Sequence, residues 1–171
     1  MTATADTISA YAGRTTSPEG TKRLAATLAP LLRAGDVVVL SGGLGAGKTQ
    51  FVQGVASGLG VREQVTSPTF NILLDYVGTS GPALCHFDLY RLDDESQLED
   101  VGYFETVGGP GVVFIEWGEK FPAALPEEFL EVAITAGTGQ ERRFSLRAHG
   151  ARPAALLAAW ALDPASGLEP A

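Results

Sequence analysis

The fold of this chain is decided by the stretch Ser41-Gly42-Gly43-Leu44-Gly45-Ala46-Gly47-Lys48-Thr49. It fits the pattern G-x-x-x-x-G-K-[ST], in which a glycine-rich loop cradles phosphates. Residues 36–40 before it contain a β-branched apolar run typical of a buried parallel strand, and residues 50–56 after it are predicted to begin a helix. Strand, glycine loop and helix in this order are the context that the motif requires. We therefore expect an α/β fold, a P-loop NTPase-like three-layer sandwich with a mixed, mainly parallel sheet and antiparallel strand pairs.

The loop has the chemistry of an anion site. Its glycines permit positive φ and let backbone N–H groups approach an anion closely. The free N–H groups at the start of the following helix point at the same place. Lys48 supplies a point charge for the outer phosphates, and the Thr49 hydroxyl is placed to ligate Mg²⁺; the alternative is a glycine-rich turn with a chance lysine. We predict that a nucleoside triphosphate binds through Gly43, Leu44, Gly45, Ala46, Gly47, Lys48, Thr49 and Gln50.

Composition narrows the function classes. The 171 residues include 12 basic and 20 acidic side chains, and the resulting net charge of −8 weakens any direct grip on nucleic acid. If RNA is involved, we expect a partner protein to hold it. The single cysteine, Cys85, excludes an internal disulfide and suits a reducing cytoplasm. The first residues lack a secretory signal, and no apolar run approaches the ~20 residues of a membrane span, so we expect a cytoplasmic protein.

The remaining pattern predicts a single P-loop domain over residues 1–150, with a C-terminal helix and a frayed tail over residues 151–171. The stretch Thr16-Ser17-Pro18-Glu19 is a helix-start signal, and leucines at helical spacing continue that helix toward Gly35. The other predicted elements are an edge strand at 8–11, an antiparallel hairpin of 70–77 and 83–89, an acidic helix at 93–100 with a loop through 108–111, an apolar strand at 112–115, a strand pair at 129–136 and 142–148, and a helix whose apolar face carries Pro153, Leu156, Leu157 and Trp160.

Hydrolysis of a bound triphosphate needs an acid beside Mg²⁺ and a group that orients the attacking water. Glu116 follows the apolar strand 112–115, so it lies at the carboxyl end of a strand, where parallel α/β sheets place their ligand sites. The Mg²⁺-supporting acid is expected there, although an ordinary strand-end glutamate is the alternative. The candidate catalytic residues are therefore Lys48, Glu116 and a second acid, Asp88.

Asp88 belongs to the stretch Cys85-His86-Phe87-Asp88-Leu89-Tyr90-Arg91. Strand alternation places His86, Asp88 and Tyr90 on one face, with Asp88 directed at the metal or its water. The open alternative is that His86 and Asp88 only satisfy each other on a half-buried strand. Arg91 pairs either with a phosphate or with a neighbouring aspartate, and spacing does not decide between them.

Two further segments have open roles. Ser67 and Thr69 flank a proline in the loop after the P-loop helix, and they resemble a switch segment that senses a γ-phosphate. Turn chemistry explains the same residues equally well. Trp117 either stacks on a base or caps the core.

Together and in this order, these motifs resemble one family, the TsaE (YjeE) family of small P-loop ATPases in bacterial tRNA threonylcarbamoyladenosine biosynthesis. The resemblance spans about residues 16–148. The matching residues are Gly43-Leu44-Gly45-Ala46-Gly47-Lys48-Thr49, Phe51, Gly54, Val65, Ser67-Pro68-Thr69-Phe70, His86-Phe87-Asp88-Leu89-Tyr90-Arg91-Leu92, Glu99, Gly102, Ile115-Glu116-Trp117 and Glu119.

The resemblance implies a function that spacing alone does not. The nucleotide would be ATP with Mg²⁺, and the protein would join the threonylcarbamoyl-transferase pair TsaD and TsaB. Its ATP cycle would support modification of the adenosine beside the anticodon in ANN-decoding tRNAs, with the tRNA contacted only indirectly and no membrane involved. It would not transfer the threonylcarbamoyl group itself.

The resemblance also implies residue roles. Thr49 and Glu116 match the Mg²⁺ ligands, and Asp88, a third candidate at the metal, matches the acid needed for hydrolysis. The loop at 16–19 and the region around Trp117 would touch the nucleotide. The remaining implied contacts are Thr16 and Glu119 at the nucleotide, and a basic phosphate or base contact near Gln140, where the nearest arginines are Arg142 and Arg143.

The main alternative is a P-loop kinase of a nucleoside or small metabolite. Such enzymes use several arginines on a lid, whereas the nine arginines here are scattered along the chain. A GTPase is disfavoured because no N-K-x-D or similar base-reading motif follows the last core strand. A nucleotide-gated binding module overlaps with the ATPase interpretation, since a slow ATPase can work as a switch.

Overall fold

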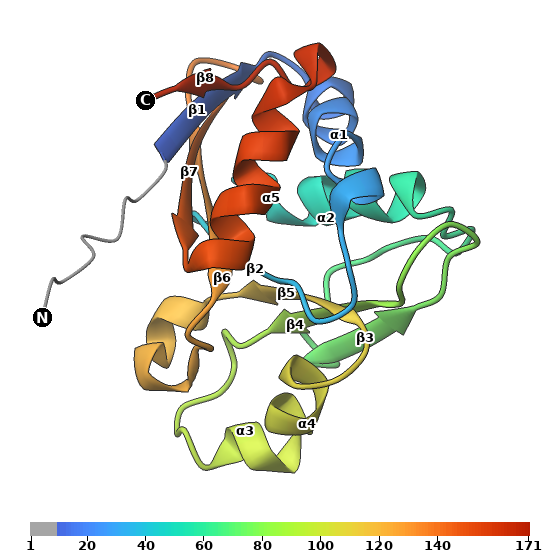
Figure 1. Cartoon of the computed structure of the whole chain (residues 1–171). Coiled ribbons are helices and arrows are strands. Elements are labelled where there is room, and N and C mark those ends of the chain that lie inside the picture. The colour runs from blue at the N-terminus through green and yellow to red at the C-terminus, as the bar shows by residue number, and fades with distance from the viewer. Residues whose placement is uncertain (1–9) are drawn as a thin grey trace, which may run out of the picture.

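We describe residues 10–171 from a computed structural model (Figure 1). Eight strands and five α-helices are joined by loops and 3₁₀ turns in this part of the chain. Of the edge strand predicted at residues 8–11, the first two residues lie outside the described residues, and Ala10 begins β1. The elements are β1 (Ala10–Thr15), α1 (Pro18–Ala26), η1 (Ala29–Leu31), β2 (Val37–Ser41), α2 (Lys48–Gly58), β3 (Leu73–Tyr76), β4 (Leu84–Asp88), α3 (Gln97–Asp100), α4 (Tyr103–Val107), β5 (Val112–Glu116), η2 (Gly118–Lys120), η3 (Pro122–Ala124), β6 (Phe129–Ala136), β7 (Arg142–His149), α5 (Ala151–Leu162), η4 (Pro164–Ser166) and β8 (Glu169–Pro170).

The strands form one mixed sheet in the order β3-β4-β5-β2-β6-β7-β1-β8. Among the described residues, three neighbouring pairs run parallel, all between β4 and β6 in this order, and four run antiparallel. The expected α/β class is confirmed, but the expectation of a mainly parallel sheet is wrong. The predicted hairpins β3–β4 and β6–β7 are present, and tight connections of this kind force antiparallel pairing.

Strand alternation divides the core between the two faces of the sheet. In β2, Val38 and Leu40 belong to a hydrophobic cluster shared with α1, α2 and α5. Val37 and Val39 belong to a second cluster, shared with α3, α4 and the segment around Phe121. Figure 1 shows these two groups of helices on opposite sides of the central strands. The run of buried valines predicted for a central strand therefore serves both faces.

The first helix begins as the sequence predicts and ends earlier. Ser17 caps it by accepting a hydrogen bond from the Gly20 N–H at 3.0 Å, and Pro18 takes the first helical position. The helix ends at Ala26 rather than near Gly35. Pro30 explains the break, because a proline cannot donate the next helical hydrogen bond, and the chain continues as the 3₁₀ turn η1.

Helix α4 was not anticipated, because the sequence predicts only a loop between the acidic helix and β5. The acidic helix itself is shorter than expected and forms only α3. Tyr103 opens α4 and is 1% exposed, and its hydroxyl donates to the Ala124 carbonyl at 3.1 Å. Five residues are too few for helical periodicity to be visible in the sequence.

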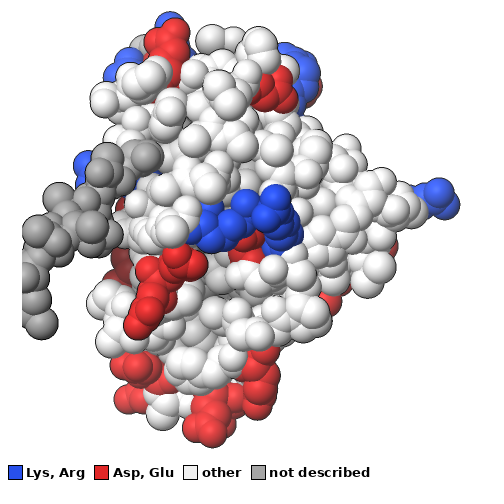
Figure 2. All heavy atoms as spheres, in the orientation of Figure 1, with Lys and Arg blue, Asp and Glu red and all other residues white. Residues whose placement is uncertain are grey.

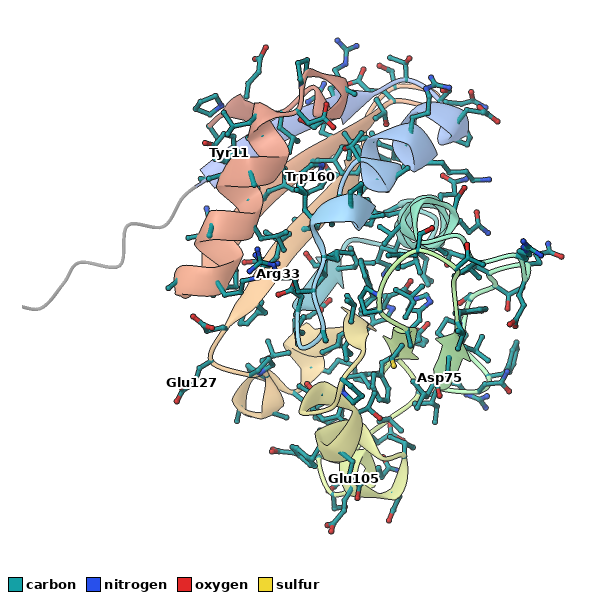
Figure 3. The ribbon with its side chains drawn as sticks, turned by 45° about the vertical axis from the view of Figure 1, so that its right-hand side comes forward. Tyr11, Arg33, Asp75, Glu105, Glu127 and Trp160 are labelled. Carbon is teal, nitrogen blue, oxygen red and sulfur yellow. The ribbon has the colours of Figure 1, made fainter. Side chains whose placement is uncertain are left out.

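The C-terminal segment is part of the core. Helix α5 buries Pro153, Leu156, Leu157 and Trp160, the face that the sequence predicts. Trp160 points from α5 into the interior (Figure 3) and meets the Phe51 ring edge-on, with the centroids 6.2 Å apart. Its indole Nε1 donates to the Thr27 hydroxyl at 2.7 Å.

The sequence predicts that the last nine residues are frayed, but they are paired with the rest of the structure. Asp163 caps the turn η4 by accepting from the Ala165 N–H at 2.9 Å. Strand β8 then pairs antiparallel with β1, and the Ala171 N–H donates to the Ala10 carbonyl at 3.1 Å. Leu168 is buried between these two contacts, and burial of this side chain opposes fraying. Within residues 10–171, no helix combines the length and apolar character needed to cross a lipid bilayer.

We expect Trp160→Ala to lower the free energy of unfolding by about 3–5 kcal/mol, because it opens a cavity and removes the bond to Thr27. Leu162→Ala is the matched control on the same helix, since Leu162 is 82% exposed, and we expect it to change stability by less than about 0.5 kcal/mol. Urea denaturation followed by circular dichroism measures both. A loss below ~1 kcal/mol for Trp160→Ala would contradict the integration of α5 into the core.

Candidate functional site

The glycine loop joins the end of β2 to the start of α2, as the motif requires. Gly42, Gly45 and Gly47 all have positive φ, at 147°, 74° and 104°. A side chain on Gly42 would place its Cβ 2.5 Å from the Ile134 carbonyl oxygen on β6, so only glycine fits there. The loop thus packs closely against β6 at Gly42, and its backbone turns with positive φ.

A cavity of about 250 Å³ lies against this loop. It joins the loop to the segment 67–69, to the ends of β4 and β5, and to the residue after β5. The lining residues are Leu44, Gly45, Ala46, Gly47, Lys48, Thr49, Gln50, Ser67, Thr69, Asp88, Glu116 and Trp117. Most of the residues singled out from the sequence therefore meet in one place.

Three of the predicted contacts do not line this cavity. Gly43 is exposed at the tip of the loop, and Glu119 is exposed on the turn η2. Thr16 lines a separate hollow beside Arg14, Gly20 and the turn η4. These three residues remain unsupported as nucleotide contacts.

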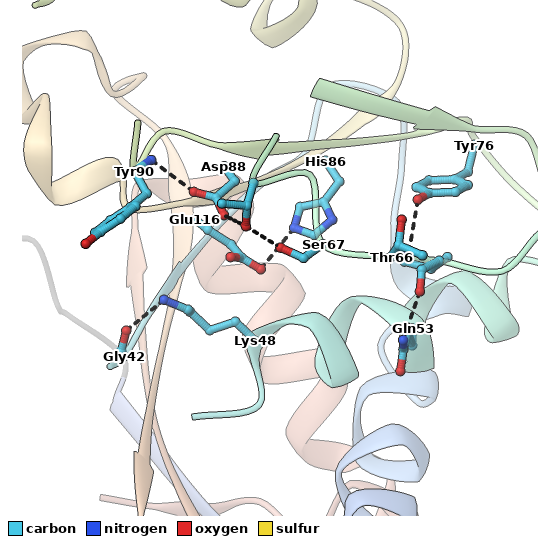
Figure 4. A network of polar contacts seen from close by, with 12 residues as sticks. Gly42, Lys48, Gln53, Thr66, Ser67, Tyr76, His86, Asp88, Tyr90 and Glu116 are labelled. Atoms are coloured by element: carbon cyan, nitrogen blue, oxygen red, sulfur yellow. Dashed lines mark hydrogen bonds and ion pairs between the residues drawn. The ribbon is translucent and has the colours of Figure 1, made fainter. Parts of the chain in front are cut away.

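The two acids lie side by side on neighbouring strands of the sheet. Asp88 and Glu116 are register partners at the ends of the parallel strands β4 and β5, and both are 3% exposed. Asp88 accepts hydrogen bonds from the Thr69 hydroxyl at 3.0 Å and from the Tyr90 N–H at 2.9 Å. The Thr69 hydroxyl lies 2.7 Å from that of Ser67. Figure 4 shows this network beside the glycine loop.

His86 holds Glu116 rather than Asp88. Its ring is fully buried, and Nε2 lies 3.1 Å from Oε1 of Glu116. Its Nδ1 is buried with no hydrogen-bond partner among the described residues. A carboxylate accepts, so Nε2 carries the hydrogen of this bond. The alternative in which His86 and Asp88 satisfy each other is therefore wrong, and sequence reasoning missed the role of His86 at Glu116.

Lys48 is directed back across the loop. Its side chain is largely buried, and the ammonium group donates to the Gly42 carbonyl at 2.7 Å (Figure 4). Its Nζ lies 4.1 Å from the centroid of the Trp117 ring. Trp117 has φ of 63°, a left-handed conformation that costs a bulky residue about 1–3 kcal/mol. Backbone strain of this kind clusters at functional sites, so the contact of Trp117 with the motif lysine Lys48 points to a role at the cavity.

Tyr90 does not extend the strand face of His86 and Asp88, as the alternation predicts, because the strand ends before it. Strand β4 ends at Asp88, and the Tyr90 side chain is 47% exposed, with its ring centroid 4.9 Å from that of Trp117. Within residues 10–171, Arg91 makes no ion pair with Asp93 or Asp94, so only its expected contact with a phosphate stays a prediction. Its guanidinium carbon lies 5.3 Å from the centroid of the Phe70 ring.

The arginines near Gln140 take different partners. Arg143 donates to the Glu141 carboxylate at 2.8 Å, while Arg142 donates to the Ala46 carbonyl of the glycine loop at 2.9 Å. Because neighbouring strand residues point to opposite faces, only one of them could reach the loop. The Arg143 and Arg14 guanidiniums hold the pKa of Glu141 below its usual value.

The cysteine and the acidic end of the molecule do not provide a nucleophilic thiol or a phosphate-binding surface. Burial, followed by the nearby Asp75, raises the pKa of Cys85 to about 12, so this cysteine stays a protonated, poorly nucleophilic thiol at neutral pH. Figure 2 shows acidic side chains gathered at the end of the molecule that carries α3 and α4, with a basic group near the middle of the same face. The acidic end offers no phosphate-gripping surface.

The donor set at the cavity fits Mg²⁺ bound together with phosphate. Among residues 10–171, no three His, Cys, Asp or Glu side chains are grouped so as to hold a metal ion by themselves. Mg²⁺ typically binds through one or two carboxylates, a hydroxyl and substrate phosphates, and keeps some of its water. Glu116, Asp88 and the Thr49 hydroxyl at the same cavity supply the protein part of such a set.

Comparison with known proteins agrees with this geometry. The family model for "Threonylcarbamoyl adenosine biosynthesis protein TsaE" matches residues 15–144. The tRNA threonylcarbamoyladenosine biosynthesis protein TsaE of Bacillus subtilis is 43% identical over 139 residues, which cover 81% of this chain and 86% of that protein. Its counterpart in Streptomyces coelicolor is 43% identical over 120 residues, covering 69% of this chain and 80% of that protein.

A solved structure is also similar. The crystal structure of Bacillus subtilis YdiB superposes with a TM-score of 0.79 at 33% sequence identity, covering 94% of this chain and 99% of that one. The resemblance inferred from the motifs is confirmed by these matches. The chain belongs to the TsaE family of tRNA threonylcarbamoyladenosine biosynthesis proteins.

Proposed function

We propose that this protein binds and hydrolyses ATP with Mg²⁺ and so supports the threonylcarbamoylation of the adenosine beside the anticodon in ANN-decoding tRNAs. It would act in the cytoplasm as an auxiliary subunit of the transferase complex, with TsaD and TsaB as partners, and be slow when alone. The observation that carries the ATPase part is the register pair Asp88–Glu116 beside Lys48 and Thr49 in one cavity. Family membership supports the tRNA modification pathway.

The loop and Lys48 would bind the triphosphate. Backbone N–H groups at the start of α2 and in the left-handed loop suit an anion, and no carboxylate competes within the loop itself. Lys48 has three N–H donors, so it would keep its bond to the Gly42 carbonyl and direct the others at phosphate oxygens in place of the Trp117 ring. The motif assigns it to the outer phosphates. Trp117 and Leu44 line the same cavity and would flank the nucleotide.

The two acids would divide the remaining work. Thr49 and Glu116 would hold Mg²⁺, which when bound neutralises charge on the phosphate oxygens. His86 donates to one oxygen of Glu116, and this bond would orient the other oxygen toward the cavity. Asp88 is oriented by Thr69 and by the Tyr90 N–H, which suits a group that positions water. Ser67 and Thr69 would couple this acid to the occupancy of the cavity, as a switch segment does.

The acidic balance fits an auxiliary role. The net charge of −8 and the acidic end at α3 and α4 repel the phosphates of a tRNA, so this protein is poorly suited to bind tRNA directly. A partner would therefore hold the tRNA. A small-molecule kinase is not favoured, because Lys48 is the one basic residue lining the cavity in the described part of the chain, and Arg91, Arg142 and Arg143 are engaged elsewhere.

We expect Lys48→Ala to weaken ATP binding by about 100-fold or more, because a charge-assisted contact to the outer phosphates is lost. Isothermal titration calorimetry measures the dissociation constant. Lys22→Ala, which removes the same charge from an exposed position on α1, is the control and should change affinity less than about twofold. Equal ATP affinities of the wild-type protein and Lys48→Ala would contradict the assignment of the glycine loop as a phosphate-binding loop.

Asp88→Asn should leave ATP affinity within about threefold while lowering turnover by about 100-fold or more, because water positioning matters only in the chemical step. Glu116→Gln should instead raise the Mg²⁺ concentration needed for half-maximal nucleotide binding. Asp75→Asn on the neighbouring strand β3 is the matched control, with an exposed carboxylate outside the cavity. Normal turnover in Asp88→Asn would remove this residue from the hydrolytic site.

The proposed pathway is tested by measuring ATP turnover alone, and then with TsaD, TsaB and tRNA from the same organism. We expect slow turnover alone and stimulation by the complex, together with appearance of the modified nucleoside; Lys48→Ala should abolish both. Fast turnover that needs a small-molecule phosphate acceptor and ignores the complex would establish a kinase instead.

A further inference from the structure

Arg142 contacts the glycine loop from outside the cavity. Its guanidinium donates through Nε to the Ala46 carbonyl at 2.9 Å and through Nη2 to the Gly45 carbonyl at 3.4 Å. The third nitrogen, Nη1, donates to carbonyls of its own hairpin, those of Glu141 at 2.8 Å and Gly139 at 3.4 Å. Every guanidinium nitrogen therefore bonds a backbone carbonyl, and the side chain bridges the β6–β7 turn and the loop.

These bonds constrain the direction of the loop's N–H groups. In a trans peptide the carbonyl of one residue and the N–H of the next point in opposite directions. The carbonyl of Ala46 is held toward Arg142, so the N–H of Gly47 points away from it. Gly47 lines the cavity and precedes the first turn of α2, where phosphate-binding N–H groups are needed. Arg142 thus holds the peptide whose orientation matters for an anion.

The β6–β7 turn that carries Arg142 is itself stabilised by several hydrogen bonds. Glu141 is largely buried and accepts from Arg14 at 2.9 Å and from Arg143 at 2.8 Å. The turn closes with a bond from the Gly137 N–H to the Glu141 carbonyl at 2.9 Å. Arg142 is the first residue of β7, so its backbone is also paired, with Thr15 of β1 and Ala136 of β6. The loop is therefore tied to the sheet through Arg142.

We propose that Arg142 is a positioning residue for nucleotide binding, acting through the glycine loop and contacting neither the phosphates nor the base. This proposal rests on nucleotide binding as proposed above. The fork of the guanidinium is essential to it, because a lysine has a single nitrogen and cannot span loop and hairpin together. It also differs from a direct phosphate or base contact near Gln140, since Arg142 does not line the cavity.

The test compares Arg142→Gln, Arg142→Lys and Arg143→Gln. Arg143→Gln is the matched control, because it removes the same charge from the next residue, whose partner is Glu141 rather than the loop. Hydrogen exchange of the amides at 43–49 in the nucleotide-free protein reports on the loop itself. Calorimetry with ATP and with inorganic tripolyphosphate reports on binding, and thermal melting confirms that each variant folds.

We expect Arg142→Gln to speed exchange at 43–49 by about tenfold and to weaken ATP and tripolyphosphate equally, by about tenfold. Arg142→Lys should restore less than half of either effect, and Arg143→Gln should change both by less than about twofold. If Arg142→Gln does not fold, exchange in Arg142→Lys decides the question.

Three results would overturn the proposal. A loss for ATP alone with unchanged exchange would mean a base contact. Rescue of binding by lysine with unchanged exchange would mean a direct charge on the phosphates. Unchanged binding and exchange would mean that the bridge is incidental. Failure of the wild-type protein to bind ATP would instead remove the proposed function, while the exchange measurement would still decide whether Arg142 orders the loop.

Discussion

The parallel pairing of β4, β5 and β2 is the constraint on which the site depends. In this register Asp88 lies beside Glu116, and Glu116 lies beside Leu40, one residue before the strand gives way to the glycine loop. Parallel strands end at the same edge of the sheet, so an acid at the end of each strand lies next to the glycine loop. The antiparallel strands beyond β6 add rigidity and, through the β6–β7 turn, a second support for the loop.

Asp88 and Glu116 are buried at one edge of the sheet, so their carboxyl groups need hydrogen-bond donors. Two carboxylates 3% exposed would be costly if unpartnered, and each is given donors from a different element. Thr69 and the Tyr90 N–H serve Asp88, and His86 serves Glu116. Because their donors differ, a change in the 67–69 segment acts on Asp88 without directly disturbing Glu116. Such separation suits a site in which one acid senses and the other binds.

Local patterns predicted what depends on local sequence. The strand–loop–helix unit, the helix start at Thr16-Ser17-Pro18, both hairpins and the buried face of α5 follow from turn residues, caps and periodicity. The pairing of His86 with Glu116 does not, because these residues are 30 positions apart and the register between strands is set by packing. The choice between Arg142 and Arg143 likewise needs the face of β7, and the ordered tail needs β1 as a partner.

The environment of Lys48 determines how its charge contributes to binding. A nearly buried ammonium group requires compensation, and here the Gly42 carbonyl and the Trp117 ring provide it. A lysine ammonium has three N–H donors, so a phosphate that engages Lys48 can replace the Trp117 ring while the bond to Gly42 is kept. The affinity gained is then a difference between two compensated states. The strained backbone of Trp117 belongs to the same balance, because the ring is held over the lysine by a conformation that costs free energy. Movement of Lys48 toward phosphate would release that ring, and with it the Tyr90 side chain, whose ring packs against Trp117 at a tilt of 50°.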